Sequence, residues 1–214
     1  MKKAVFFFLL LCLDAWAVDD ASLARIAKSV EQAPVIRANF EQIKTIRSLK
    51  RPLRLSGRLV FSRRHGVLWA IEYPYRMTYV LGEERVVEIG GDGTRRERAS
   101  SELSGFAQTA RIFRALLSAE TQVLKDYFDA RGKTSIEREG GEPISWELSL
   151  LPKREPLARF LSGMRVSGSR FIESLVIDEA LGDRSEIRFS GARGDVALSE
   201  DEQALFEGTS QEKP

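Results

Sequence analysis

The sequence predicts an α+β fold in which an antiparallel sheet buries one of its two faces. Short runs that alternate apolar and polar residues recur along the chain, for example from Ser56 to Pro74. Such alternation is typical of strands with one buried face. Helical spacing of apolar residues is confined to an N-terminal segment, to residues 104–130 and to two short segments nearer the C-terminus. The strands therefore form the framework, and the helices are additions to it.

The N-terminus has the three parts of a secretory signal peptide. Lys2 and Lys3 precede an apolar run from Ala4 to Leu13, and the small-x-small tripeptide Ala15-Trp16-Ala17 follows. The apolar run is short for a bilayer span, so we expect residues 1–17 to be cleaved after Ala17 rather than kept as a membrane anchor.

The rest of the chain is long enough for one domain with its own core. We expect residues 18–207 to form that domain and residues 208–214 to be a disordered tail. The one cysteine, Cys12, would be removed with the signal peptide. The mature protein would then have no disulfide bonds.

The N-terminal half is predicted to be a helix followed by a β-meander. Leu23, Ile26, Ala27 and Val30 have helical spacing before Pro34. Strands are predicted at 36–46, on both sides of the turn Arg63–Gly66, and at 77–81 and 85–90. One parity of these strands carries Phe40, Leu59, Phe61, Trp69, Ile71, Tyr73, Met77 and Tyr79.

The C-terminal half is predicted to begin with a helical pair at 104–130. Its apolar stripes are Phe106, Phe113, Leu116 and Leu117, then Leu124 and Phe128, and Ser118 is a candidate cap for the second helix. Strands are predicted to resume at 145–151, 171–178 and 184–190, with Trp146, Leu148, Phe171 and Leu175 among their apolar residues. Short helices are expected after Pro156 and after Ser199.

Charge and chemistry exclude several classes of function. The chain has 33 basic and 31 acidic residues, so we expect no nucleic-acid binding. His65 is the only histidine, and no Gly-x-Ser-x-Gly motif is present. We therefore expect no enzyme, no metal site and no cofactor. Basic residues do gather between Arg47 and Arg64, as either a solvated face or a surface for an anionic partner.

The aromatic strand face is open to two interpretations: it is an ordinary core, or it holds an apolar ligand. A resemblance bears on this choice. Phe40 with Gln42, then Gly57, Leu59, Phe61, Arg63, Trp69 and Pro74, follow one another as in the LolA family of periplasmic lipoprotein carriers. One departure is Arg64, which stands where that family usually has proline.

The resemblance implies an unclosed antiparallel β-barrel, a half-barrel, with helices forming a lid over an apolar cavity. It implies a monomeric periplasmic carrier of a Gram-negative bacterium. Such a carrier takes acylated lipoprotein or another lipid from an inner-membrane ABC exporter or other permease and passes it to an outer-membrane acceptor. Arg63 would tie the barrel to the lid. The residues expected to line the cavity are Phe40, Leu59, Phe61, Trp69, Ile71, Tyr73, Met77, Tyr79, Phe106, Phe113, Leu116, Leu117, Trp146, Leu148, Phe171 and Leu175.

Two other functions are weighed beside the carrier. One is a periplasmic sensor of lipid or lipoprotein that regulates a membrane signalling protein. The other is a hydrolase of acylated substrates, which would need His65 as its base.

Overall fold

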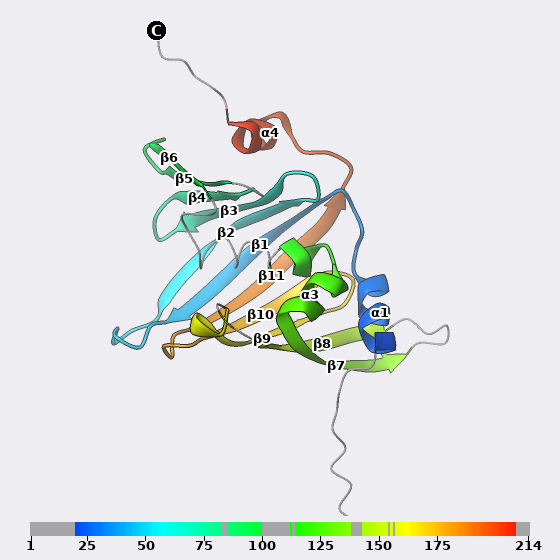
Figure 1. The fold of residues 1–214 in the computed structure, drawn as a ribbon. Helices are drawn as coiled ribbons and strands as arrows, with labels where there is room; N and C mark the ends of the chain where they lie inside the picture. The colour runs from blue at the N-terminus through cyan, green and yellow to red at the C-terminus, as the bar shows by residue number, and fades with distance from the viewer. Residues whose placement is uncertain are drawn as a thin grey trace, which may run out of the picture.

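The structure is a computed structural model that describes residues 20–82, 85–99, 112, 114–137, 143–153, 155 and 157–208. Its framework is one sheet of eleven strands, and every neighbouring pair is antiparallel (Figure 1). The strands are β1 (Val35–Thr45), β2 (Leu53–Ser62), β3 (Gly66–Tyr73), β4 (Met77–Leu81), β5 (Arg85–Gly90), β6 (Arg95–Ala99), β7 (Phe128–Glu137), β8 (Pro143–Pro152), β9 (Leu161–Gly168), β10 (Ile172–Glu179) and β11 (Arg184–Asp195). The helices are α1 (Asp20–Ser29), α3 (Thr121–Tyr127), the 3-10 helix η2 (Leu157–Arg159) and α4 (Glu200–Glu207), and residues 114–117 are also helical.

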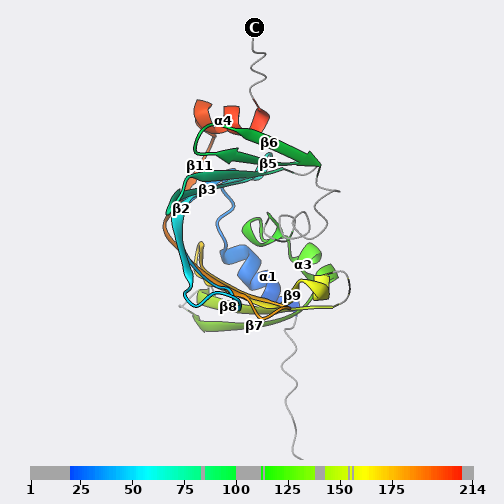
Figure 2. The ribbon, with the colours of Figure 1, turned by 90° about the vertical axis from the view of Figure 1, so that its left-hand side faces the viewer.

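The sheet is an unclosed half-barrel. Its strand order is β6-β5-β4-β3-β2-β1-β11-β10-β9-β8-β7, so β6 and β7 are separate edges. The first and last strands of the chain, β1 and β11, pair at its centre. Figure 2 shows the sheet curving around α1, α3 and the helical residues before α3. The predicted fold class is confirmed.

Several element predictions were incomplete or wrong. β6, β7 and β9 were not predicted; β6 has five exposed residues, and its composition Arg-Arg-Glu-Arg-Ala lacks apolar alternation. Phe128 was assigned to a helix, but it begins β7. Phe106, Phe113, the predicted signal peptide and the predicted tail after Gly208 lie outside the described residues.

Residues 118–120, between helical residues 114–117 and α3, end the first helix and do not cap the second. Ser118 was expected to cap α3, but its hydroxyl lies 2.7 Å from two acceptors, the carbonyl oxygen of Arg114 and the carboxylate of Glu120. Ala119 has a positive φ of 54°, the left-handed conformation that ends many helices. The N-cap of α3 is Glu120, which makes no side-chain capping bond.

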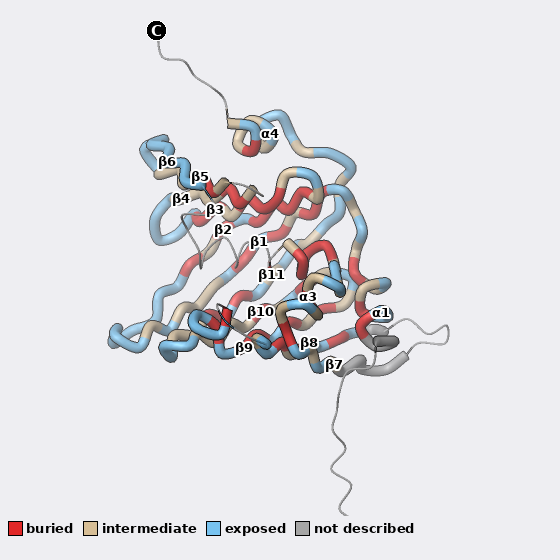
Figure 3. The backbone as a smooth tube through the Cα atoms, in the orientation of Figure 1, coloured by how far each residue is buried: buried red, intermediate tan, exposed pale blue. Residues whose placement is uncertain are grey.

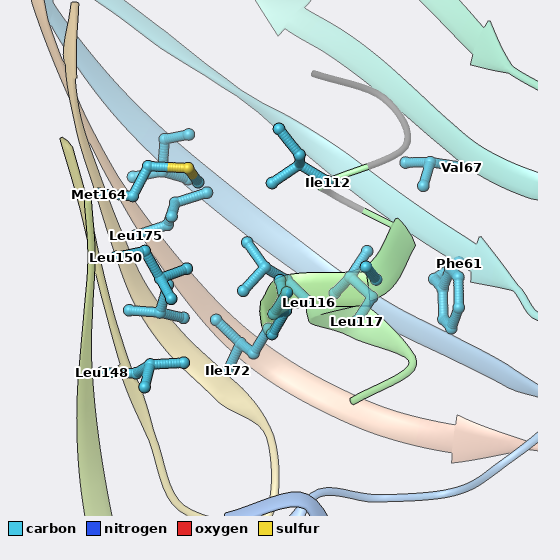
Figure 4. Packing of buried hydrophobic residues seen from close by; sticks show 14 of the residues in the cluster. Phe61, Val67, Ile112, Leu116, Leu117, Leu148, Leu150, Met164, Ile172 and Leu175 are labelled. Carbon is cyan, nitrogen blue, oxygen red and sulfur yellow. The ribbon is translucent and has the colours of Figure 1, made fainter. Parts of the chain in front are cut away.

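The main core lies between the concave face of the sheet and the helices. Figure 3 marks buried residues in red on both the strands and the helices. Leu23 and Ile26 of α1 and Leu124 of α3 belong to it. Figure 4 shows Leu116 and Leu117 between Phe61 of β2 and Leu148 of β8. We call β2–β6 and β7–β10, which flank the central pair β1 and β11, the two wings of the half-barrel. The helices therefore join the two wings by apolar packing.

A second core lies on the convex side, beneath α4. Val60, Leu68 and Val80 point to this face because side chains alternate across a strand, and Phe206 of α4 packs against them. The short helix expected after Ser199 is present as α4, and it begins with a capping box in which Ser199 and Glu202 bond each other's backbone N–H groups. Figure 2 shows α4 outside the sheet, next to β5 and β6.

An arginine on the convex face holds α4 in place. Arg37 of β1 donates from Nε to Glu202 at 2.8 Å and also bonds Asp195 and the carbonyl of Ala197. The hydrogen bond from Arg37 holds the pKa of the Glu202 carboxyl below its ordinary value, against the opposing effect of burial.

Gly57 allows a close backbone approach within the sheet. The β2–β3 ladder shifts register between Ser56 and Gly57. A Cβ atom at Gly57 would lie 1.9 Å from the carbonyl oxygen of Ala70, which no side chain tolerates. The glycine therefore permits the irregular pairing at this point.

Gly57→Ala is expected to lower the free energy of unfolding by about 1–3 kcal/mol, because β2 and β3 must move apart. Chemical denaturation measures this change. Gly163→Ala in β9 is the control, since its Cβ would meet only ordinary contacts, the nearest at 3.4 Å. Equal effects of the two substitutions would contradict the argument.

Glu202→Gln is expected to destabilise the protein by about 1–3 kcal/mol near neutral pH, because a charge-assisted bond to Arg37 is lost. A carboxyl with a lowered native pKa stabilises the fold above its ordinary pKa of 4.5, and this stabilisation is lost as pH falls through the lower native value. The difference between wild type and variant should therefore shrink on acidification. Denaturation at several pH values tests this, with Glu207→Gln, an exposed carboxyl of the same helix, as the control.

Candidate functional site

Aromatic rings from the central strands form one wall of the concave face. The rings of Phe40 in β1 and Trp69 in β3 are stacked, with centroids 3.9 Å apart. Phe189 of β11 meets Trp69 edge to face at 6.2 Å. Phe40 is fully buried, whereas Trp69 is only partly buried and keeps one side toward the space beneath the helices.

That space is a cavity of about 580 Å³ between the two wings of the sheet. Its lining is mostly apolar, with side chains from β2–β4, from β9–β11 and from the segments that cover them. The apolar and aromatic lining residues are Leu55, Trp69, Ile71, Tyr75, Tyr79, Leu81, Ile112, Leu157, Phe160, Leu161, Met164, Ile177 and Ile187. The two wings thus face one another across a hollow that their own side chains leave unfilled.

The polar lining residues lie on one side of the cavity, where β1, β10 and β11 are neighbours in the sheet. Lys44 pairs with Glu179 at 2.9 Å, and Gln42 donates to the hydroxyl of Ser185 at 3.2 Å. These groups satisfy one another, so no net charge faces the cavity there. Burial raises the pKa of the Tyr79 phenol above its ordinary value of 10.

The predicted cavity residues occupy three kinds of position. Trp69, Ile71 and Tyr79 line the cavity. Most of the others are in the concave core around it, either buried or packed against its edge: Phe40, Leu59, Phe61, Met77, Leu116, Leu117, Trp146, Leu148, Phe171 and Leu175. Tyr73 is 63% exposed at the end of β3.

Several lining residues were missed by sequence reasoning. Met164 lies on β9, which was not predicted as a strand. Ile177 and Ile187 share the parity of Leu175 and Phe189 on predicted strands, so the alternation signal was available for them. Leu157 and Phe160 come from the η2 segment, for which the sequence has no cavity signal.

Arg63 joins the sheet to both helical segments that cover the cavity side. It sits in the β2–β3 turn and donates to the carbonyl of Ala33 at 3.2 Å and to the Gln32 side chain at 2.7 Å, both just after α1. It also donates to the carbonyl of Ser118, at the end of helical residues 114–117, at 3.4 Å. A cation suits this position because the last carbonyls of a helix carry partial negative charge.

The neighbouring Arg64 points elsewhere. It is exposed and lines a separate hollow on the convex side with His65, Arg85 and Phe206. His65 bonds Ser62 through Nδ1 at 3.1 Å and lies against the ring of Phe206. We call α1, residues 114–117 and α3 the cover. Of the two arginines, Arg63 is the one that contacts the cover.

The described residues hold no group of three or more histidines, cysteines or carboxylates that could bind a metal. Within the same residues, no helix is both long enough and apolar enough to cross a bilayer.

Solved structures with a similar arrangement of elements are distant in sequence. A DUF1329 family protein from Desulfovibrio piger is 14% identical, with a TM-score of 0.47 over 87% of this chain and 95% of that one. A LolA superfamily protein from Nitrosomonas europaea is 9% identical, with a TM-score of 0.47 over 89% and 98%. A chain of the MucA/MucB complex from Pseudomonas aeruginosa is 15% identical, with a TM-score of 0.45 over 86% of this chain and 60% of that one.

No curated protein sequence matches the chain. A family model does match, over residues 14–209, and its description is outer membrane lipoprotein carrier protein LolA-like. The match spans the whole sheet, the cavity and α4. The chain therefore belongs to the LolA-like family.

Proposed function

We propose that this protein is a periplasmic carrier that shields the acyl chains of lipoproteins, or of a related lipid, between the inner and outer membranes. The observation that carries the proposal is the apolar cavity of about 580 Å³ between the wings of the half-barrel. Pockets that enclose small ligands usually measure about 300–1,000 Å³. Family membership supports the same class of cargo.

The energetics of acyl chains explain why such a carrier is needed. Each methylene group taken from water is worth about 0.8 kcal/mol, so one chain of about 16 carbons is worth roughly 12 kcal/mol. A free chain cannot cross an aqueous compartment at a useful concentration against that cost. The cavity lining supplies an apolar surrounding, and the satisfied polar pairs Lys44–Glu179 and Gln42–Ser185 do not oppose it.

Release requires that something compete with the bound chain. The cover does so when it closes over the empty cavity, and Arg63 holds that cover through bonds to carbonyls on two helical segments. Without ATP in the periplasm, the free energy for loading must come from the donor, an inner-membrane ABC exporter or other permease. An outer-membrane acceptor then takes the cargo.

An enzymatic role has no support among the described residues. The only histidine, His65, lies on the convex side against α4, away from the cavity. His65→Ala should therefore leave cargo binding unchanged.

Ile177→Trp is expected to reduce bound acyl lipid severalfold, because the larger ring fills the cavity. Native mass spectrometry of protein purified from the periplasm, followed by organic extraction, measures the bound lipid. Val176→Trp is the matched control, since it places the same ring on the opposite face of β10. A wild-type protein that stays free of lipid after incubation with solubilised lipids would refute the carrier.

Arg63→Leu is expected to leave the fold intact but to slow cargo release or block transfer, because the cover loses its tie to the sheet. Transfer of labelled lipoprotein from carrier to acceptor membranes is the measurement. Arg64→Leu is the control, as Arg64 lines the separate hollow on the convex side. Equal transfer by both variants would contradict the role of Arg63. Co-purification with one membrane signalling protein in place of an exporter would instead favour the sensor.

A further inference from the structure

The turns at one end of the sheet surround the mouth of the cavity. We call them the rim: residues 46–54, 73–76, 157–160 and 180–183. The backbone N–H of Arg47 donates to Asp183 at 2.9 Å, and that of Ala180 donates to the carbonyl of Phe160 at 3.0 Å, so three of the four segments are joined. Figure 1 shows the β1–β2 turn, the β10–β11 turn and η2 on the side opposite α1.

The rim is where the cavity meets solvent. Tyr75 and Phe160 both line the cavity, and each side chain is about half exposed, at 49% and 50%. α1 lies at the other end of the sheet (Figure 1). A ligand can therefore reach the cavity past the rim, on the side away from α1.

The rim also presents apolar side chains to solvent. Leu181, at the tip of the β10–β11 turn, is 82% exposed. Eight large apolar side chains are exposed among the described residues, and six of them belong to the rim: Leu49, Leu53, Tyr73, Tyr75, Phe160 and Leu181. They come from separate turn tips, so they form projections and not one flat patch.

Unpaired positive charge accompanies these side chains. The segment 46–54 carries Arg47, Lys50, Arg51 and Arg54 and no acidic residue. None of these four side chains has an ion-pair partner among the residues that the structure describes.

The acids near the rim are already occupied by other groups. Glu179 pairs with Lys44, and Asp178 pairs with Arg184. Asp183 accepts from the backbone of Arg47. The four rim segments contain six basic residues and one acidic residue, Asp183, so the net charge of the rim is positive and is concentrated in the β1–β2 turn.

We propose that the rim docks on a bilayer surface that contains anionic phospholipid, with the cavity mouth facing the membrane. Basic residues bind anionic headgroups, and leucine and tyrosine side chains enter the boundary between headgroups and acyl chains. Separate protruding tips fit a deformable lipid surface better than the flat apolar centre of a protein interface. The benefit to transfer rests on the proposed carrier function, because a docked mouth lets an acyl chain pass between bilayer and cavity without crossing water.

Vesicle flotation tests the docking directly. Lipid-free protein from cells that express the full chain is mixed with vesicles of phosphatidylcholine alone or of phosphatidylcholine with phosphatidylglycerol. It should bind only the anionic vesicles, and added salt should weaken binding. Arg51→Gln should reduce partitioning about fivefold, the effect of one basic residue near an anionic surface. Arg188→Gln, an exposed arginine on the convex face of β11, is the control and should bind as the wild type does.

A fluorophore attached at Leu181→Cys tests insertion of the tip. Cys12 lies in the predicted signal peptide, so the introduced cysteine is the only one expected in the exported protein. An environment-sensitive label there should become brighter and shift to shorter wavelength on anionic vesicles. The same label at Ser190→Cys, an exposed position of β11 away from the rim, should not change.

Different experimental outcomes would overturn the docking proposal and the carrier proposal. Protein that retains acyl cargo but binds neither kind of vesicle overturns the docking proposal and leaves the carrier intact; the rim would then suit a protein partner. Equal loss of binding in Arg51→Gln and Arg188→Gln also overturns it. Protein that binds anionic vesicles through the rim but never takes up acyl lipid supports docking and overturns the carrier.

Discussion

A curved sheet that does not close has a concave apolar face that must be covered, and here the described helices cover only part of it. Each square ångström of apolar surface left in water costs about 25 cal/mol, so the remainder is unfavourable unless something fills it. α1, α3 and residues 114–117 bring the two wings together through Leu116 and Leu117. The hollow that remains, lined by Trp69, Met164 and Ile187, is the space that a ligand can occupy.

The convex face of the sheet differs from the concave face because its apolar patch is covered. α4 covers the outer core with Phe206, and Arg37 anchors it to the sheet through Glu202. The outer apolar patch is thereby closed, and apolar space remains accessible on the concave side. The strength of the Arg37 contact comes from charge-assisted bonds at partly buried groups.

The contacts of Arg63 are weaker than a pair of opposite charges, which agrees with the proposed movement of the cover. It donates to neutral carbonyls and one amide, so each bond has a charge on the arginine side only and is worth about 1.5–3 kcal/mol net. An acyl chain worth roughly 12 kcal/mol of burial can outweigh a few such bonds. In the proposed carrier, closure and cargo compete for the same space, and the proposed docking of the rim gives the acyl chain a route to a membrane.

The sequence by itself determined the sheet, its buried parity and the family, because alternation within β1–β4 and β11 is a local signal that Phe40, Phe61 and Trp69 carry clearly. It did not reveal β6, whose residues are all exposed and charged or small, nor the start of β7 at Phe128, where helical spacing continues into a strand. Which apolar residues line the cavity and which pack as core was decided only in three dimensions. Phe40 of β1 and Trp69 of β3 point to the same face of the sheet, yet Phe40 is fully buried and Trp69 faces the cavity. That difference depends on how the two wings and their cover are spaced, and spacing between distant segments has no signature in a local pattern.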